Sequence, residues 1–275
     1  MTSNRFSGDI KLVSIDVDNT LVDSRKLIPK ENIEAIKWAH QEKGIHFAIN
    51  SGRIAASTRH FMEQIGVHEC FPSLNGVLLH SWDGRILEEH SVDRDASLKI
   101  CAMARSLGVG LFAYRHEGWH LDNGQDYWAE SEFKASGIEG EMTDIELFLR
   151  SNNANKLLGA HLDENVISKL ETQILNSLSD RVDCIKSSPL FLEILPKGIN
   201  KGTAINALCR HYGIKKENVM AIGDYYNDID MFKACGLSVA MSNAPSKVRA
   251  MADYVTEADN EHGAVAEAIR FFIRP

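Results

Sequence analysis

Short apolar runs alternate with amphipathic stretches in the first part of the chain. Residues 12–15 and 46–50 are mainly apolar and too short for typical helices, so we predict two buried parallel strands. Apolar residues recur at helical spacing in 31–43 and again in 54–65, which predicts a helix after each strand. This alternation of strand and helix is typical of a parallel sheet.

The pattern changes in the middle of the chain. The turn residues 82–84 predict a hairpin, and the strands predicted beyond it are less uniformly apolar than the first two. Residues 124–153 show no clear periodicity. We therefore predict a second, α+β domain over 87–190, inserted into a discontinuous domain formed by 1–86 and 191–275.

Strand and helix alternate again after the insertion. Strands are predicted at 190–195, 219–223 and 237–241, and a last helix at 263–273. The predicted fold class is α/β, with a Rossmann-like parallel-sheet core and an inserted α+β domain.

Composition narrows the class of protein. The chain has 275 residues, 44% of them hydrophobic, and a formal net charge of −8. An acidic chain is a poor general nucleic-acid binder, and no apolar run approaches the length of a membrane span. The N-terminus has no apolar signal region, and the five cysteines include no Cys-x-x-Cys pair. We therefore expect a cytoplasmic protein with reduced cysteines, and no nucleic-acid or membrane partner.

Asp16 and Asp18 follow the first predicted strand directly. Taken alone, this stretch is explained equally well by a strand that ends in an Asx turn. Three further polar clusters stand at matching places, each just past an apolar strand or at the start of a helix. They are Ser51-Gly52-Arg53, Lys201, and Asp224 with Asn227 and Asp228.

Strand ends of a doubly wound sheet lie along one edge, so these clusters are expected to converge. Converging carboxylates repel one another, and a divalent cation relieves that repulsion. Oxygen ligands without a His or Cys cluster favour a hard ion, Mg²⁺ above others. Lys201 and the hydroxyl and amides of Ser51-Gly52 suit a phosphate group. Together the clusters predict a phosphoryl-transfer site.

The stretch Asp16-Val17-Asp18-Asn19-Thr20 resembles the first motif of the haloacid dehalogenase-like (HAD) superfamily, Asp-x-Asp-Gly-Thr. Ser51-Gly52, Lys201 and Gly223-Asp224 with Asn227-Asp228 resemble its second, third and fourth motifs. Residues 192–194, 198–202, 240–244 and 262–265 resemble the Cof-type sugar-phosphatase branch, which has an inserted C2-type (IIB) cap. The resemblance covers nearly all of the predicted core, whereas the cap is matched mainly by position.

The resemblance implies a phosphatase with Asp16 as nucleophile and Asp18 as general acid/base. It implies a Mg²⁺ site formed by the Asp16 carboxylate, the Asp18 main-chain carbonyl and the Asp224 carboxylate, with Asp228 supporting it. The implied phosphate-binding residues are Ser51, Gly52, Lys201 and Asn227, and the inserted domain is implied to be the cap over the substrate. Small phosphorylated metabolites are expected as substrates, sugar phosphates first and FMN or nucleotide-like phosphates next, with the protein a monomer or homodimer.

Asn19 stands where the family usually has Gly. Asn adopts positive φ more readily than other non-glycine residues, so we expect the turn to be preserved.

Other functions and contacts remain open at this point. A phosphomutase would share the two aspartates, and a phosphosugar sensor would keep the pocket without turnover. A dehalogenase fits less well because it needs neither Asp18 nor a metal. The sequence does not decide whether a further set of residues contacts substrate: Arg53, Asn75, His116, Trp119, His120, Tyr225 and Tyr226.

Overall fold

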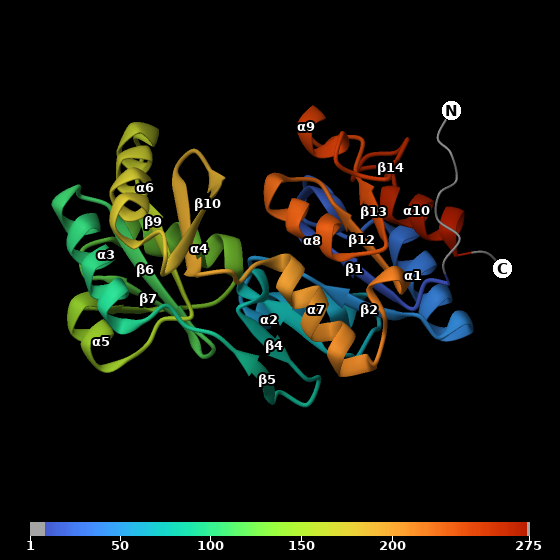
Figure 1. Cartoon of the computed structure of the whole chain (residues 1–275), viewed down its shortest axis with the longest axis horizontal. Helices are drawn as coiled ribbons and strands as arrows, with labels where there is room; N and C mark the ends of the chain where they lie inside the picture. Colours follow the sequence, from blue (N-terminus) through green and yellow to red (C-terminus); the bar gives the residue numbers. More distant parts are fainter. Residues whose placement is uncertain (1–8, 274–275) are drawn as a thin grey trace. The chain divides into compact units, whose positions relative to one another are not determined.

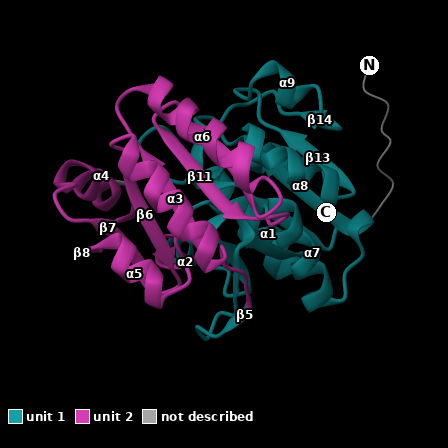
Figure 2. Ribbon diagram, turned by 60° about the vertical axis from the view of Figure 1, so that its left-hand side comes forward, with its two compact units in different colours: residues 1–52, 58–87, 200–275 teal, residues 53–57, 88–199 magenta. Residues whose placement is uncertain are grey.

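The computed structural model describes residues 9–273 and divides the chain into two compact units (Figures 1 and 2). Unit 1 comprises residues up to 52, 58–87 and from 200 onward. Unit 2 comprises 53–57 and 88–199. Among the described residues, no helix is both long enough and apolar enough to cross a membrane.

Unit 1 is built on a parallel sheet with the strand order β14-β13-β12-β1-β2. Every strand pair in it is parallel, and β1 at its inner position is fully buried. The predicted Rossmann-like parallel core is therefore confirmed. Its strands are β1 (Leu12–Ile15), β2 (His46–Ile49), β12 (Val219–Gly223), β13 (Leu237–Ala240) and β14 (Tyr254–Val255).

Helices cover both faces of this sheet. Figure 1 shows α7 and α8 on one side of it and α1 and α10 on the other. A three-stranded sheet, with the order β3-β4-β5, contains the predicted hairpin. The helices are α1 (Lys30–Lys43), α2 (Ala55–Gln64), α7 (Lys201–Tyr212), α8 (Ile229–Ala234), α9 (Ser246–Arg249) and α10 (Ala264–Phe272). The small strands are β3 (Phe71–Ser73), β4 (Leu78–His80) and β5 (Ile86–Glu89).

Unit 2 contains a six-stranded mixed sheet with the order β10-β11-β9-β6-β7-β8. Helices α3, α5 and α6 pack against one face through an apolar core, and Figure 2 shows α4 on the other side of the sheet. The strands are β6 (Gly110–Arg115), β7 (Gly118–Asp122), β8 (Glu141–Thr143), β9 (Lys156–Ala160), β10 (Val182–Ser188) and β11 (Phe191–Pro196). The helices are α3 (Arg94–Ser106), α4 (Asp126–Ser136), α5 (Ile145–Ser151) and α6 (Glu164–Leu178).

The division between the units differs from the predicted domains after residue 190 and also at 53–57, which the sequence placed in the first domain. The sequence placed 191 onward with the first domain, but β11 pairs with β9 and β10 and belongs to unit 2. Leu192 and Ile194 of β11 lie in the apolar core beneath the helices of unit 2, which secures the strand there. The stretch 124–153, in which no pattern was recognised, contains α4, β8 and α5.

Asn32 connects three segments of unit 1. This residue of α1 is fully buried, and its side-chain amide donates to the carbonyl oxygen of Leu21 at 3.3 Å. Its side-chain oxygen accepts from the amide of Ala266 in α10 at 2.9 Å. One side chain thus satisfies a carbonyl of the loop after β1 and an amide in the first turn of α10, which has no partner within the helix.

We predict that Asn32→Ala lowers the free energy of unfolding by about 2–4 kcal/mol, because it leaves two buried backbone groups without their partner. Urea unfolding followed by circular dichroism measures this change. Glu34→Ala, at an exposed position of the same helix, is the control and should change stability by less than about 0.5 kcal/mol. Equal stability of Asn32→Ala and the parent protein would contradict this account.

Candidate active site

Asp16 follows β1 and begins a tight turn over Val17–Leu21. Asn19 lies within that turn at φ +58°, in the left-handed region, so the expectation that Asn would preserve the turn is confirmed. The carbonyl of Asn19 accepts a hydrogen bond from the side-chain amide of Asn243 at 3.0 Å. The turn therefore directs the backbone away from the strand immediately after Asp16.

Lys201 holds two of the predicted acidic residues together. Its ammonium nitrogen lies 2.5 Å from Oδ1 of Asp16 and 2.6 Å from Oδ1 of Asp228, and its side chain is only 1% exposed. Burial favours the neutral amine, but the two carboxylates outweigh it and raise the pKa of Lys201 above its usual value. The lysine is therefore a buried cation, not the surface lysine that its residue type alone would suggest.

Helix α7 positions Lys201 at its first residue. Asn200 caps the helix, since its side-chain oxygen accepts from the amides of Gly202 and Thr203. The Thr203 hydroxyl in turn accepts from the amide of Asn200, which completes a capping box. The side-chain amide of Asn50, at the end of β2, donates to the carbonyl of Lys201 at 2.9 Å. The lysine backbone is thus fixed from two directions.

Asp224 and Asp228 follow β12 and are tied together through the backbone. Oδ2 of Asp228 accepts from the amides of Asp224 and Tyr225 at 2.9 and 3.0 Å. Oδ1 of Asp224 accepts from the hydroxyl of Thr20 at 3.0 Å. Thr20 thereby connects the turn after β1 with the loop after β12, a role that sequence reasoning did not assign to it.

The residues present fit a divalent metal ion. Asp16, Asp224 and Asp228 are all buried, and one carboxylate oxygen from each lies within 4.8 Å of the others. Burial raises the pKa of Asp224 to about 7, and the nearby charge of Asp228 adds to the shift. Burial likewise raises the pKa of Asp16, although Lys201 opposes that shift. Three hard oxygen donors that repel one another are the donor set that a bound divalent cation stabilises.

Ser51 and Gly52 follow β2, the strand adjacent to β1. The carbonyl of Ser51 accepts from the amide of Asn75 at 2.9 Å. A Cβ atom at Gly52 would lie 3.1 Å from the Asn75 side-chain nitrogen, so the close approach of these two residues favours glycine at position 52.

Three consecutive residues beside Gly52 have positive φ. They are Leu74 at +52°, Asn75 at +59° and Gly76 at +90°. This conformation is unfavourable for a branched residue such as Leu74, and such strain persists only where the surroundings impose it. A Cβ atom at Gly76 would lie 2.6 Å from the carbonyl oxygen of Asn200. The strained turn therefore packs against Gly52 and against the residue that caps the Lys201 helix.

Asp18 does not belong to the buried acidic group. Its carboxylate is 39% exposed and accepts from the Lys26 ammonium at 2.8 Å. Lys26 has a φ of +63° in a turn whose centre is Asp23. The Asp23 carboxylate accepts from the amides of Arg25 and Leu27, and these hydrogen bonds lower its pKa. Lys26 is a partner of Asp18 that the sequence did not reveal, because nothing in the local pattern marks it.

Residues near the C-terminus support the turn after β1. Asn260 donates to the carbonyl of Val22 at 3.1 Å, and the Glu261 carboxylate accepts from the amide of Ser24 at 2.7 Å. With Asn243 and Asn32, they satisfy polar backbone groups of the segment that carries Asp16 and Asp18. Asn243, Asn260 and Glu261 lie more than 200 positions from Asp16, which explains why sequence reasoning missed them.

The other candidate residues are less closely tied to the buried group. Asn227 is partly buried in the turn after β12, and the Tyr225 and Tyr226 side chains there are 38% and 45% exposed. Arg53 donates to the hydroxyl of Ser57 at 3.2 Å. In unit 2, Trp119 and His120 belong to β7, and His116 lies in the turn between β6 and β7. The Trp119 indole donates to the carbonyl of Ile138, which indicates a packing role.

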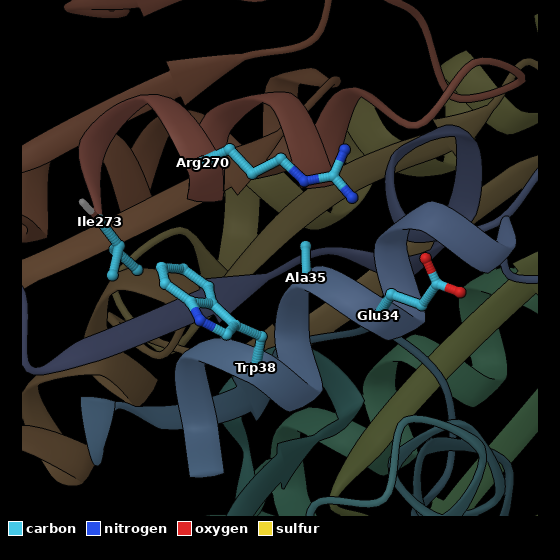
Figure 3. Close-up of a pocket in the computed structure, with 5 residues that line it drawn as sticks. All are labelled: Glu34, Ala35, Trp38, Arg270 and Ile273. Carbon is cyan, nitrogen blue, oxygen red and sulfur yellow. The ribbon is translucent and has the colours of Figure 1, made fainter. Parts of the chain in front are cut away.

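A separate cavity of about 350 Å³ lies between α1 and α10 (Figure 3). Trp38, Ala35 and Ile273 form its apolar part, and Glu34 and Arg270 flank it. Figure 3 shows the Trp38 ring beside Ile273. None of the predicted site residues lines this cavity.

Comparison with known proteins identifies relatives along nearly the whole chain. A family model described as haloacid dehalogenase-like hydrolase matches residues 13–269. The 5-amino-6-(5-phospho-D-ribitylamino)uracil phosphatase YcsE of Bacillus subtilis is 30% identical over 274 residues, which cover 99% of this chain and 100% of that protein.

Solved structures agree with this match. A haloacid dehalogenase-like hydrolase from Bacteroides thetaiotaomicron has a TM-score of 0.85 at 28% identity, covering 96% of this chain and all of that one. The HAD subclass IIB sugar phosphatase BT4131 has a TM-score of 0.84 at 23% identity, covering 95% of this chain and 98% of that one. The second comparison bears on the fold alone.

The buried carboxylates should lower the free energy of unfolding when no metal ion is bound. Because the pKa of Asp224 is raised in the folded state, its ionisation destabilises that state increasingly as the pH rises from about 4 to about 7. Asp224→Asn should therefore be more stable than the parent protein in EDTA at pH 8, on the order of 1–4 kcal/mol. The gain should shrink steadily toward pH 4.

Urea unfolding in EDTA across this pH range measures the difference. Asp230→Asn, which removes a partly exposed carboxylate from α8, is the control and should show little dependence on pH. A parent protein more stable than Asp224→Asn at pH 8 without metal would contradict the argument.

Proposed function

The chain belongs to the haloacid dehalogenase-like hydrolase family, and we propose that it is a Mg²⁺-dependent phosphatase that hydrolyses small phosphate monoesters through an aspartyl-phosphate. The observation that carries this proposal is the buried contact of the Asp16 carboxylate with the Lys201 ammonium, beside Asp224 and Asp228. A carboxylate held next to a fixed cation can attack phosphorus while the cation balances the negative charge of the phosphoryl oxygens.

The Asp16 and Asp224 carboxylates and the Asp18 main-chain carbonyl are the proposed metal ligands, with Asp228 in support. A bound Mg²⁺ would neutralise charge on the phosphoryl group and on the carboxylates. Asp228 already has both carboxylate oxygens engaged, one by Lys201 and one by backbone amides. This arrangement supports an indirect role for Asp228, as an orienting group for the lysine and the Asp224 loop.

Asp16 is the proposed nucleophile, with phosphate held by Lys201, Ser51, Gly52 and Asn227. Asp18 is the proposed general acid for the leaving oxygen and general base for the attacking water. Its contact with Lys26 adds a constraint, because protonation of Asp18 abolishes that ion pair. Proton transfer by Asp18 is therefore coupled to the contact that orients its side chain.

Sugar phosphates are the favoured substrate class, and 5-amino-6-(5-phospho-D-ribitylamino)uracil is the first compound to test. A relative that is 30% identical over almost the full length of both chains is named as a phosphatase of this compound. It combines a phosphorylated sugar-alcohol chain with a nucleotide-like ring, so it unites the two expected classes. FMN and related phosphates follow.

Unit 2 is the proposed cap, and unit 1 the proposed catalytic core. The protein is proposed to act in the cytoplasm on small phosphorylated metabolites, as a monomer or homodimer.

Release of inorganic phosphate distinguishes this hydrolase from a phosphomutase, which returns the phosphoryl group to substrate. The presence of nucleophile, cation and acidic group in one site argues against a sensor without turnover.

We predict that chelation with EDTA abolishes phosphate release and that added Mg²⁺ restores it. Ca²⁺ should support little turnover, because it is larger and imposes geometry less strictly. Phosphate release from a panel of phosphorylated metabolites, followed with and without each ion, is the measurement. Full activity in EDTA would rule out the metal-dependent mechanism.

Replacing each of the two aspartates of the first motif should impair a different step of the reaction. Asp16→Asn removes the nucleophile and should abolish turnover of every substrate. Asp18→Asn lacks the proton donor, which contributes roughly 10²–10⁴-fold to the rate. Hydrolysis of a sugar phosphate, which has a poor leaving group, should therefore slow most. p-Nitrophenyl phosphate has a good leaving group and should still phosphorylate Asp16 in this variant, after which the aspartyl-phosphate should accumulate.

Rapid mixing with p-nitrophenyl phosphate measures this difference. Asp18→Asn should give a burst of nitrophenolate near one equivalent per site and then slow turnover, whereas Asp16→Asn should give no burst. Equal loss on both substrates without a burst in either variant would show that the two roles are wrongly assigned.

A further inference from the structure

The unit 2 sheet has two faces of different character. Alternate residues of β6, β9 and β11 enter the apolar core beneath α3, α5 and α6, among them Leu111, Leu157 and Leu192. The intervening residues Tyr114, Lys156 and Glu193 therefore lie on the opposite face. All three are less than 9% exposed, so this face buries a phenol, an ammonium and a carboxylate.

These residues form a contiguous polar cluster. Tyr114 and Lys156 are directly paired across β6 and β9, and the Lys156 ammonium lies 4.4 Å from the centre of the Tyr114 ring. The same ammonium lies 3.2 Å from the Glu193 carboxylate on β11. Glu132 of α4 completes the cluster through a hydrogen bond with the Tyr114 hydroxyl.

Stability alone gives a weak reason for such a cluster. Replacement of a buried ion pair by well-packed apolar residues is often neutral or stabilising. Aromatic side chains already fill the neighbouring part of this face, where Phe112 contacts Trp119 and Trp128 contacts Phe191. Burial also raises the pKa of Glu132, although Lys156 opposes the shift. Buried ionisable groups whose pKa is shifted in this way are frequent at functional sites.

The chemistry of the cluster limits what it can bind. Two carboxylates repel a second anionic group, and the Lys156 ammonium repels a cationic one. The ammonium donates hydrogen bonds, the carboxylates accept them, and the Tyr114 hydroxyl can do both. Hydroxyl groups both donate and accept, so a neutral chain of hydroxyls matches this mixture better than a charged or apolar ligand.

The chain also connects this cluster to a predicted phosphate-binding residue. Burial raises the pKa of Glu132, and the positive charge of Arg53 is among the groups that oppose this shift. Arg53 follows Gly52 directly in the sequence and is grouped with unit 2.

We propose that Tyr114, Glu132, Lys156 and Glu193 recognise the hydroxyl groups of a sugar or sugar-alcohol phosphate and thereby determine substrate specificity. This inference rests on the proposed phosphatase function and names the residues that select its substrate. The four side chains are proposed to contact the hydroxyl-bearing part of the substrate and not the phosphate group that reacts.

The test compares two phosphate esters that differ in hydroxyl groups. Ribitol 5-phosphate and n-pentyl phosphate have the same carbon-chain length and a similar phosphate ester. Isothermal titration calorimetry with Asp16→Asn, which cannot turn over, measures binding of each. This protein should bind ribitol 5-phosphate at least about tenfold more tightly than n-pentyl phosphate.

Lys156→Met and Glu193→Gln, each introduced into Asp16→Asn, should weaken ribitol 5-phosphate binding by about 10- to 100-fold, the loss expected for a hydrogen bond to a charged group. Binding of n-pentyl phosphate should change less than about threefold. Lys186→Met removes another Lys–Glu pair of unit 2, with Glu171 at 2.9 Å, and should leave both affinities unchanged. The double variant Lys156→Met/Glu193→Leu, with an apolar pair, should remain folded and lose the preference for ribitol 5-phosphate.

Equal affinity of Asp16→Asn for the two esters would overturn the inference, as would equal weakening of both by the cluster variants. Phosphate release from ribitol 5-phosphate by the parent protein is measured separately. A retained binding preference without any release would contradict the phosphatase proposal but support recognition by the cluster. The two proposals can therefore fail independently.

Discussion

The buried ammonium of Lys201 is the interaction on which the site in unit 1 depends. It lies within 2.6 Å of carboxylate oxygens from Asp16 and Asp228, and it is shielded almost completely from solvent. Without this cation, three buried carboxylates would meet at one sheet edge with only their hydrogen bonds to offset desolvation and mutual repulsion. The capping of α7 by Asn200 and the Asn50 contact fix the lysine backbone so that the ammonium serves both carboxylates.

The elements of unit 1 were predictable because their physical causes are local. A buried parallel strand must be a short apolar run, and β1, β2 and β12 all are. The clusters around Asp16, Ser51 and Asp224 were recognisable for the same reason, because polar groups directly after such runs lie at the carboxyl edge of the sheet. Even Asn19, an exception to the family motif, could be interpreted through its tolerance of positive φ.

What the sequence did not reveal depends on contacts between distant segments. Lys26 is set opposite Asp18 by a turn that Asp23 organises, and neither residue type nor spacing marks that contact. The stretch 124–153 lacked a clear period because α4 exposes Tyr127 and Phe133 while burying Trp128, which obscures an amphipathic pattern. The boundary after residue 190 was misplaced because β11 has the same strand pattern in either sheet, and only its partners β9 and β10 decide.

The turn after β1 explains why residues so far apart in the sequence must cooperate. A backbone that leaves its strand at Asp16 loses the regular hydrogen bonds of the sheet, and its carbonyls then need other partners. Asn243, Asn260 and Asn32 provide them, donating to the carbonyls of residues 19, 22 and 21 respectively. Amide side chains suit this task because they donate without adding charge beside an already acidic site. The C-terminal segment is thus part of the structure that positions the two aspartates, although it supplies none of the proposed reacting groups.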